Sequence, residues 1–363
     1  MMGEKPKVVV VGPLPPPVHG VTVYIQRILN SGLKDNFEVR HLDTSDHRTV
    51  GNIGALDIGN FTLAFKSYAQ LVKMCLKSRP DLVYVPISQT FLGFFRDAFY
   101  IVVPRLFFRS KIVIHLPGGY FGSFYDQSGL PTRKGIDFVM RFVDRVVVLG
   151  EVMRPIFRKW FDDSQIDVAP NGTDLVVKGV DKKLQGTGSA RVFTFMSSLM
   201  RTKGIVEFIK AALLALDKHP QSVFNVAGEW WPQEPDLRPE VESMLAASPH
   251  GDKIVFHGLV TGEEKEKLLF ETDVFVLPTY YPFEGHPTVI IEAMAAGCPV
   301  ISTEHAAIPE TVIHGETGII VDKGDAGSLA TAMFELIEND MRFKSMARGS
   351  YARYKENYTV EKS

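Results

Sequence analysis

Two carboxylates stand out by their spacing. Glu284 and Glu292 are separated by seven residues around a predicted helix start, and the helix that holds Glu292 otherwise consists mainly of Val, Ile, Ala and Met. A helix that is apolar all round is normally buried, and a buried carboxylate is costly unless a polar group meets it. A pair of ligand hydroxyls, as on a ribose, would meet Glu292. A neighbouring backbone group or a basic side chain would do so equally in a purely structural role.

The segments around the two carboxylates predict an anion site. A buried strand, a loop and a helix are expected at 274–277, 280–286 and 288–296. Pro287 suits the first helical position, and Gly297 ends the helix. The N–H groups of Thr288 and Val289 would then stay unpaired at the positive end of the helix dipole. A strand, a loop and a free helix N-terminus at the carboxyl edge of a parallel sheet favour an anionic ligand.

A basic turn precedes these segments in the same half of the chain. Residues 197–204 follow an apolar strand pattern and place Arg201 and Lys203 just before a helix. Such a turn offers backbone N–H groups and two cations to a diphosphate, and Arg can bind a phosphate bidentately. A solvated basic turn is the alternative, and the carboxylate pair in the same domain favours the diphosphate.

Two residues of the first half are candidates for ligand contact. Gly20 ends a proline-rich loop at a helix start, where a chain without a side chain can approach a ligand closely. His115 ends the apolar strand KIVIH, so it would face the ligand-binding edge of a parallel sheet. A core histidine with satisfied nitrogens is the alternative.

The stretch from Glu284 to Ile301 resembles the Glu, seven residues, Glu motif of the retaining GT-B glycosyltransferases of family four. Its tail, EAMAAGCPVI, is similar to the family's usual wording. The resemblance implies that Glu284 contacts the donor sugar and that Glu292 holds the ribose of a sugar nucleotide. It also implies donor binding by Gly285 and His286, together with Thr288 and Val289.

Other motifs match the family less closely. Lys203-Gly204 match the end of its phosphate-binding turn, but Ser197 and Ser198 stand where the family has a Gly-Arg pair. The resemblance implies that His115 contacts the sugar or the acceptor, although Leu116 follows it where Gly is common. It also places the Asn171-Gly172 turn beside an interdomain hinge.

Apolar strand patterns alternate with helical patterns along the whole chain, which predicts an α/β fold built from parallel units. Strands are expected at 8–11, 37–41, 82–85, 112–115, 145–149, 192–196, 223–227, 254–256, 274–277 and 299–302. The main helices are expected at 21–29, 61–77, 205–218 and 326–338, with a closing helix from Met341. The resemblance implies GT-B architecture, in which two doubly wound Rossmann-like domains face each other across a cleft.

The alternation also predicts domain bounds. We expect an N-terminal acceptor-side domain at 1–176, followed by a polar linker at 177–189. A C-terminal nucleotide-sugar-binding domain is expected at 190–340, and a C-terminal helix that packs back toward the N-terminal domain at 341–363.

Charge and cysteine content bear on location. Residues 1–188 hold 24 Lys and Arg against 17 Asp and Glu, a net charge of +7, and the remainder carries −9. The basic half is expected to face something anionic. Cys75 and Cys298 lie in apolar contexts and are expected to be buried thiols of a reducing compartment. Because the apolar run near the start is too short for a signal peptide, we expect a cytoplasmic protein, with peripheral attachment to the inner face of the membrane as a further expectation.

An aromatic stretch between 91 and 111 is the candidate for that attachment. Its aromatic and basic side chains are Phe94, Phe95, Phe99, Tyr100, Phe107 and Phe108 among Arg96, Arg105 and Arg109. This pattern is too interrupted to span a bilayer but suits an interfacial helix on an anionic leaflet. A core helix of the first domain is the alternative.

The expected activity is transfer of a sugar from a nucleoside-diphosphate sugar to a hydroxyl of a lipid-linked or saccharide acceptor, with retention and without a metal. His115, Glu284, Arg201 and Lys203 are the expected catalytic residues. No Asp-x-Asp tripeptide occurs, and no cofactor or nucleic-acid partner is expected. UDP-sugars are favoured over GDP-sugars as donors. A nucleotide-sugar-binding module without catalysis, a nucleotide-sugar epimerase and a phosphorylase are the alternatives.

Overall fold

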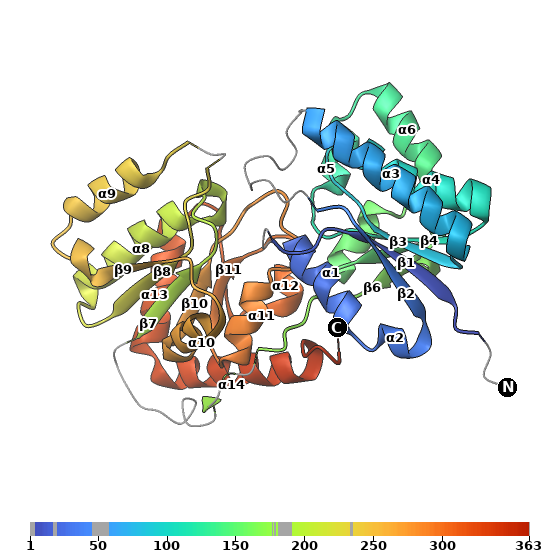
Figure 1. The fold of residues 1–363 in the computed structure, drawn as a ribbon. Coiled ribbons are helices and arrows are strands. Elements are labelled where there is room, and N and C mark those ends of the chain that lie inside the picture. The colour runs from blue at the N-terminus through green and yellow to red at the C-terminus, as the bar shows by residue number, and fades with distance from the viewer. Residues whose placement is uncertain are drawn as a thin grey trace. The chain divides into compact units, whose positions relative to one another are not determined.

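The computed structural model describes residues 4–16, 20–45, 58–175, 177, 179–180, 191–232 and 235–362, with the backbone alone at 58–61. The chain forms two compact units, Met1–Ala169 and Pro170–Ser363 (Figure 1). The expected linker at 177–189 lies largely outside the described residues.

The first unit is built on a six-stranded parallel sheet in the order β2-β1-β3-β4-β5-β6. Its strands are β1 (Lys7–Gly12), β2 (Glu38–Asp43), β3 (Leu82–Pro86), β4 (Lys111–His115), β5 (Arg145–Val148) and β6 (Ile166–Val168). Its helices are α1 (Gly20–Asn30), α2 (Leu33–Asn36), α3 (Ile58–Ser78), α4 (Phe91–Phe108), α5 (Phe121–Gln127) and α6 (Leu130–Met140), with short 3₁₀ helices η2 (Glu151–Ile156) and η3 (Asp163–Gln165).

The second unit repeats this design with a parallel sheet in the order β12-β11-β10-β7-β8-β9. Its strands are β7 (Val192–Met196), β8 (Val223–Ala227), β9 (Ile254–Gly258), β10 (Val274–Leu277), β11 (Val300–Thr303) and β12 (Gly318–Val321). Its helices are α8 (Ile205–Lys218), α9 (Arg238–Ala246), α10 (Gly262–Glu271), α11 (Thr288–Ala295), α12 (Ile308–Thr311), α13 (Ala326–Glu338) and α14 (Asp340–Asn357), with η4 (Arg201–Lys203) and η5 (Gly251–Lys253).

The expected α/β fold with two doubly wound units is therefore confirmed. Strand β10 is buried along its whole length, as a central parallel strand covered on both faces should be. Cys75 and Cys298 are buried free thiols, as expected. Strand β12 was not expected from the sequence. Helix α14 packs against α11 and α13 within the second unit.

Helices α3, α4 and α6 form one layer of the first unit, with α4 in contact with both of the others (Figure 1). The aromatic stretch forms α4, and its side chains divide between two environments. Phe94 and Tyr100 are fully buried, whereas Phe107 is 74% exposed. Because Phe94 and Tyr100 are buried, the interfacial interpretation is wrong for these side chains, and the core-helix alternative applies to them. No helix in the described part of the chain is both long and apolar enough to cross a membrane.

Candidate functional site

The predicted basic turn and the predicted loop meet at one edge of the second sheet. Strands β7 and β10 pair in parallel, so the segments that follow them leave the same edge. The N–H of Tyr280 donates to the carbonyl oxygen of Thr202 at 2.8 Å, which joins the two segments directly. Gly204 has φ +86°, and a Cβ there would lie 2.6 Å from the carbonyl oxygen of Pro278. Only glycine fits this close approach.

This arrangement brings Lys203 and Glu284 together. The Nζ of Lys203 lies 2.6 Å from Oε2 of Glu284, and the two side chains are 14% and 10% exposed. The hydroxyl of Thr279 donates to the same Oε2 at 3.0 Å. The Lys203 ammonium also lies 4.6 Å from the centre of the Tyr281 ring. A cation and a carboxylate are thus held side by side in a nearly dry position, where charges interact strongly.

Glu292 has a basic partner of its own. It lies on α11 with 8% of its surface exposed, as the apolar sequence around it predicted. Its Oε2 lies 2.6 Å from the Nζ of Lys265 on α10. The structural alternative, a basic side chain that compensates the buried carboxylate, is therefore present. No sequence pattern indicated this role of Lys265.

The N-terminus of α11 differs slightly from its prediction. Pro287 is the N-cap residue, with ψ 109°, and the first helical residue is Thr288. Among the described residues, no acceptor is recorded for the N–H groups of Thr288 and Val289, which belong to the first turn of the helix. The preceding Gly285 is buried, and its carbonyl oxygen accepts from the N–H of Ala307 at 3.0 Å.

His286 is fixed from three sides. The N–H of Asn171 donates to its Nδ1 at 3.0 Å, which places the ring proton on Nε2, 2.6 Å from the hydroxyl oxygen of Thr311. The side-chain amide of Asn171 donates to the His286 carbonyl oxygen at 2.7 Å. Burial lowers the pKa of His286 to about 4. Since both ring nitrogens are engaged inside the unit, this imidazole orients the loop.

Arg201 points to a different partner from Lys203. It pairs with Glu240 on α9, and both side chains are about half exposed. The two cations of the basic turn therefore have different surroundings. Lys203 is nearly buried beside Glu284, whereas the Arg201 guanidinium lies among solvated charges.

In the first unit, His115 ends β4 with 1% of its surface exposed. Among the described residues neither Nδ1 nor Nε2 has a hydrogen-bond partner, and burial lowers the pKa of this histidine to about 3. The Tyr24 ring lies 4.4 Å from the His115 ring, centre to centre. The hydroxyls of Tyr24 and Tyr84 are hydrogen-bonded to each other at 2.7 Å. His115 is therefore a neutral, aromatic-covered imidazole and does not match the core histidine with satisfied nitrogens.

The second unit matches a known protein-family model. Residues 190–339 match the model described as glycosyl transferases group 1. Residues 190–339 therefore resemble a group 1 glycosyltransferase domain. This segment holds Lys203, Glu284, Glu292 and Lys265, so the geometry above belongs to it.

Solved structures support the same conclusion for the fold. Sucrose-phosphate synthase from Thermosynechococcus elongatus superposes with a TM-score of 0.74 at 18% identity, over 98% of this chain and 96% of that chain. Anabaena HepE in complex with UDP superposes with a TM-score of 0.71, also at 18% identity and over 98% and 96% of the two chains. The expected GT-B fold is therefore confirmed.

Curated relatives match over shorter stretches. The amylovoran biosynthesis glycosyltransferase AmsK of Erwinia amylovora is 34% identical over 109 residues, which are 29% of this chain and 27% of that protein. This chain covers between 27% and 55% of the length of the first curated relatives.

Gly20 begins α1 in the first unit and is exposed. A Cβ at this position would meet nothing within 4 Å, so packing inside the protein does not require glycine here. The residues before it at 17–19 lie outside the described part of the chain.

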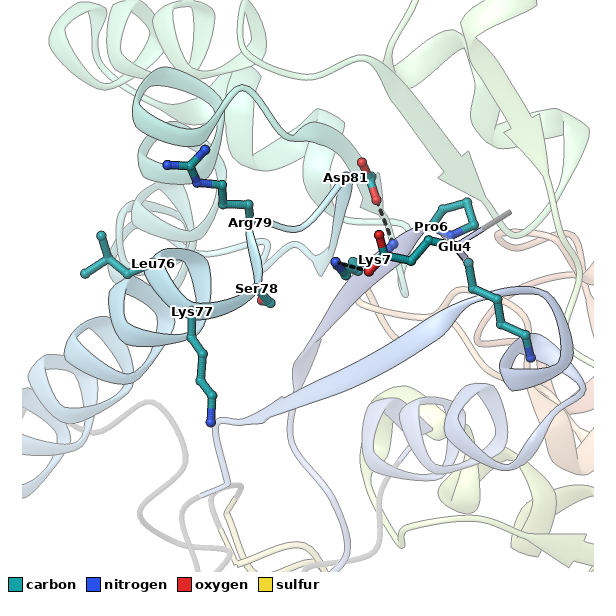
Figure 2. Close-up of a pocket in the computed structure, with 9 residues that line it drawn as sticks. Glu4, Pro6, Lys7, Leu76, Lys77, Ser78, Arg79 and Asp81 are labelled. Carbon is teal, nitrogen blue, oxygen red and sulfur yellow. Dashed lines mark hydrogen bonds and ion pairs between the residues drawn. The ribbon is translucent and has the colours of Figure 1, made fainter. Parts of the chain in front are cut away.

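A pocket of about 540 Å³ lies elsewhere in the first unit, at the amino ends of β1 and β3 (Figure 2). Figure 2 shows its two acids in contact with Lys7: Asp81 accepts from the Lys7 N–H at 2.7 Å, and Glu4 pairs with its ammonium at 2.8 Å. The pocket is at the opposite sheet edge from His115, which ends β4. None of the predicted site residues lines this pocket.

Proposed function

We propose that the chain transfers a sugar from a nucleoside-diphosphate sugar, preferably a UDP-sugar, to an acceptor hydroxyl, with retention of configuration and without a metal. The observation that carries the proposal is the Lys203–Glu284 pair at the carboxyl edge of the group 1-like domain. This edge is where open parallel sheets bind nucleotides. The structure of HepE in complex with UDP supports the choice of nucleotide.

Each residue has a part in this proposal. Lys203 and the N-terminus of α11 stabilise the negative charge that develops on the departing diphosphate. Arg201 reaches the same diphosphate from the solvated side. Glu284 binds the sugar, and Glu292 accepts hydrogen bonds from the ribose hydroxyls. His286 keeps the loop in place through its bonds to Asn171 and Thr311.

The transfer exchanges one bond for another at the anomeric carbon. The bond from this carbon to the diphosphate oxygen breaks, and a bond to the acceptor oxygen forms on the same face of the sugar. The acceptor proton moves to an oxygen of the leaving diphosphate. His115 contributes a ring nitrogen to the acceptor, because neither of its nitrogens has a partner among the residues that the structure describes.

The acceptor in this proposal is a saccharide or a lipid-linked saccharide, in the synthesis of a cell-surface polysaccharide or glycolipid. The name of the relative AmsK, which refers to amylovoran biosynthesis, supports this class of acceptor.

We further propose peripheral attachment through the outer face of the α3–α4–α6 layer. Large apolar side chains on these helices are Phe65, Leu76, Leu92, Leu106, Phe107, Leu130 and Phe138, all at least 45% exposed. Exposed basic side chains on the same helices are Lys66, Lys73, Lys77, Arg96 and Lys134. The acids of these helices, Asp97 and Asp137, are buried or half-buried. Exposed apolar groups among cations suit an anionic lipid surface.

Donor binding and transfer are tested separately. UDP should raise the melting temperature more than GDP or ADP, because a ligand that binds only the folded state stabilises it. Incubation with UDP-sugars and a saccharide acceptor should release UDP at a rate that EDTA leaves unchanged. A melting shift without UDP release would indicate a binding module, and a changed sugar without transfer would indicate an epimerase.

Vesicle co-sedimentation tests the membrane proposal. The protein should sediment with anionic vesicles at low salt and leave them at high salt. K66E/K73E should weaken this binding, whereas the control K210E/K355E, with two exposed lysines of the second unit, should not. A protein that stays in the supernatant with anionic vesicles at low salt would contradict attachment.

A further inference from the structure

The carboxylate of Glu292 has two oxygens, and the protein uses one of them. Lys265 contacts Oε2 at 2.6 Å. Within the described residues no partner is recorded for Oε1, and the side chain keeps 10% of its surface exposed. A structural ion pair and a ligand contact are therefore compatible in this carboxylate, because each can use a different oxygen.

Lys265 compensates the buried charge of Glu292 on α11. Apart from Thr288, helix α11 offers Glu292 only apolar neighbours and no charge, so a charge from another element has to compensate the carboxylate. Lys265 supplies it from α10, with its own side chain 25% exposed. An ion pair of this kind also fixes the rotamer of the carboxylate. A group held in its binding orientation loses less conformational freedom when the ligand arrives.

We propose that Lys265 is a positioning residue for the donor: it holds Oε2 of Glu292 so that Oε1 faces the ribose hydroxyls. This inference rests on the proposed function, in which Glu292 binds the ribose. Lys265 acts on the ligand through Glu292 and does not touch it. The arrangement parallels the pairing of Glu284 with Lys203, where Thr279 donates to the same carboxylate oxygen.

Helix α10 provides a matched control in Lys267. This lysine is 75% exposed and lies 3.9 Å from Glu271, which is itself 54% exposed. Both lysines are on one helix with acidic neighbours, so a change at either alters the local charge equally. Only Lys265 reaches α11.

Calorimetry with two nucleotides separates positioning from direct contact. The probes are UDP and 2′,3′-dideoxyuridine 5′-diphosphate, which lacks both ribose hydroxyls. K265Q should raise the Kd for UDP about tenfold, the size expected for coupled groups in contact. The same variant should change the Kd for the dideoxy compound less than about twofold, because the hydroxyls that Glu292 binds are absent. K267Q should change neither Kd.

Two outcomes overturn the inference. An unchanged Kd for UDP in K265Q would show that the pair does not position Glu292. An equal loss for UDP and the dideoxy compound would show that Lys265 acts elsewhere on the nucleotide. If the unaltered protein fails to bind UDP, the proposed function fails as well. If E292Q weakens UDP binding and K265Q does not, only this inference fails.

Two further variants keep the test valid if K265Q does not fold. K265R retains a cation and should keep the Kd for UDP within about threefold of the unaltered protein. K265Q/E292Q removes both charges together, which avoids an uncompensated buried carboxylate. A lysine that acts only through Glu292 leaves this double variant with the UDP affinity of E292Q. A further loss of more than about threefold would overturn the inference.

Discussion

The predicted site residues lie at two sheet edges, and their polar groups differ in whether they have partners inside the protein. In the second unit, Lys203, Glu284, Glu292 and His286 each have a protein partner within 3.0 Å. In the first unit, His115 is even more deeply buried, but neither ring nitrogen has a partner within the described part of the chain. A partnered group keeps its geometry without a ligand, whereas an unpartnered one leaves a polar atom that a ligand can satisfy. The comparison separates groups that are positioned in advance from a group that awaits its partner.

Removal of the Lys203 ammonium should have the largest effect on this comparison. Lys203→Ala should lower the turnover of UDP-sugar by roughly 10- to 1,000-fold, as loss of a preorganised charge does. Arg201→Ala should cost less, because its guanidinium is 44% exposed and held by Glu240. Steady-state kinetics of UDP release measures both. Equal losses would mean that exposure does not distinguish the two cations.

The carboxylates should differ in what they bind. Glu292→Ala should weaken UDP binding by roughly 1.5–3 kcal/mol through lost hydrogen bonds to a charged acceptor. Glu284→Ala should reduce turnover and leave affinity for UDP nearly intact, because it faces the sugar. Calorimetry with UDP alone tests both variants, and equal losses of affinity would show that the roles are misassigned.

The two histidines should differ in stability. His286→Phe leaves the Asn171 N–H and the Thr311 hydroxyl without their partner, so the free energy of unfolding should fall by roughly 1–3 kcal/mol. His115→Phe removes no hydrogen bond and keeps an aromatic ring beside Tyr24. Its free energy of unfolding at pH 7 should not fall, while turnover should. Urea denaturation and UDP release measure the two quantities, and a large loss of stability in His115→Phe would make this imidazole structural.

The smallest expected effect is shared by both histidines and concerns the pH dependence of the free energy of unfolding. Burial lowers the pKa of His115 to about 3 and that of His286 to about 4, both below the value of about 6.5 in an unfolded chain. The unfolded state then binds more protons below pH 6.5, so stability falls as the pH drops from 6.5 toward 4. Either Phe variant should reduce this slope by up to about 1.4 kcal/mol per pH unit. Urea midpoints between pH 5 and 7 measure it, and an unchanged slope would contradict the buried neutral state.

Much of the fold could be predicted because the apolar patterns are strong. The bounds of α8 and α13 coincide with those expected from sequence, and the alternation of strand and helix identified both sheets. Strand β12, with the sequence GIIV, was not expected, although β10 and β11 of the same length were. Local pattern carries little information at that length.

Site residues could be predicted only where their spacing along the sequence pointed to a function. Glu284 and Glu292 follow from their separation, and Lys203 follows from a turn before a helix. Lys265 does not, because the sequence GEEKEKLLFE gives it the same acidic surroundings as Lys267. Only the ion pair with Glu292 on α11 distinguishes Lys265, which neutralises a buried carboxylate, from Lys267 in solvent. Tyr24 was likewise invisible, since its contact with His115 joins residues far apart in the chain.

The close approach of Gly204 to Pro278 has a consequence for sequence variation. Any side chain at 204 would press on the Pro278 backbone and push apart the two turns that carry Lys203 and Thr279. In a library of all single substitutions selected for activity, position 204 should therefore be depleted of every residue except glycine, including those that charge and polarity would allow. Gly20, where a Cβ meets open space, should accept alanine in the same library as far as folding is concerned. If substitutions at a position leave the protein folded but abolish activity, that position contacts a ligand and is not required for packing.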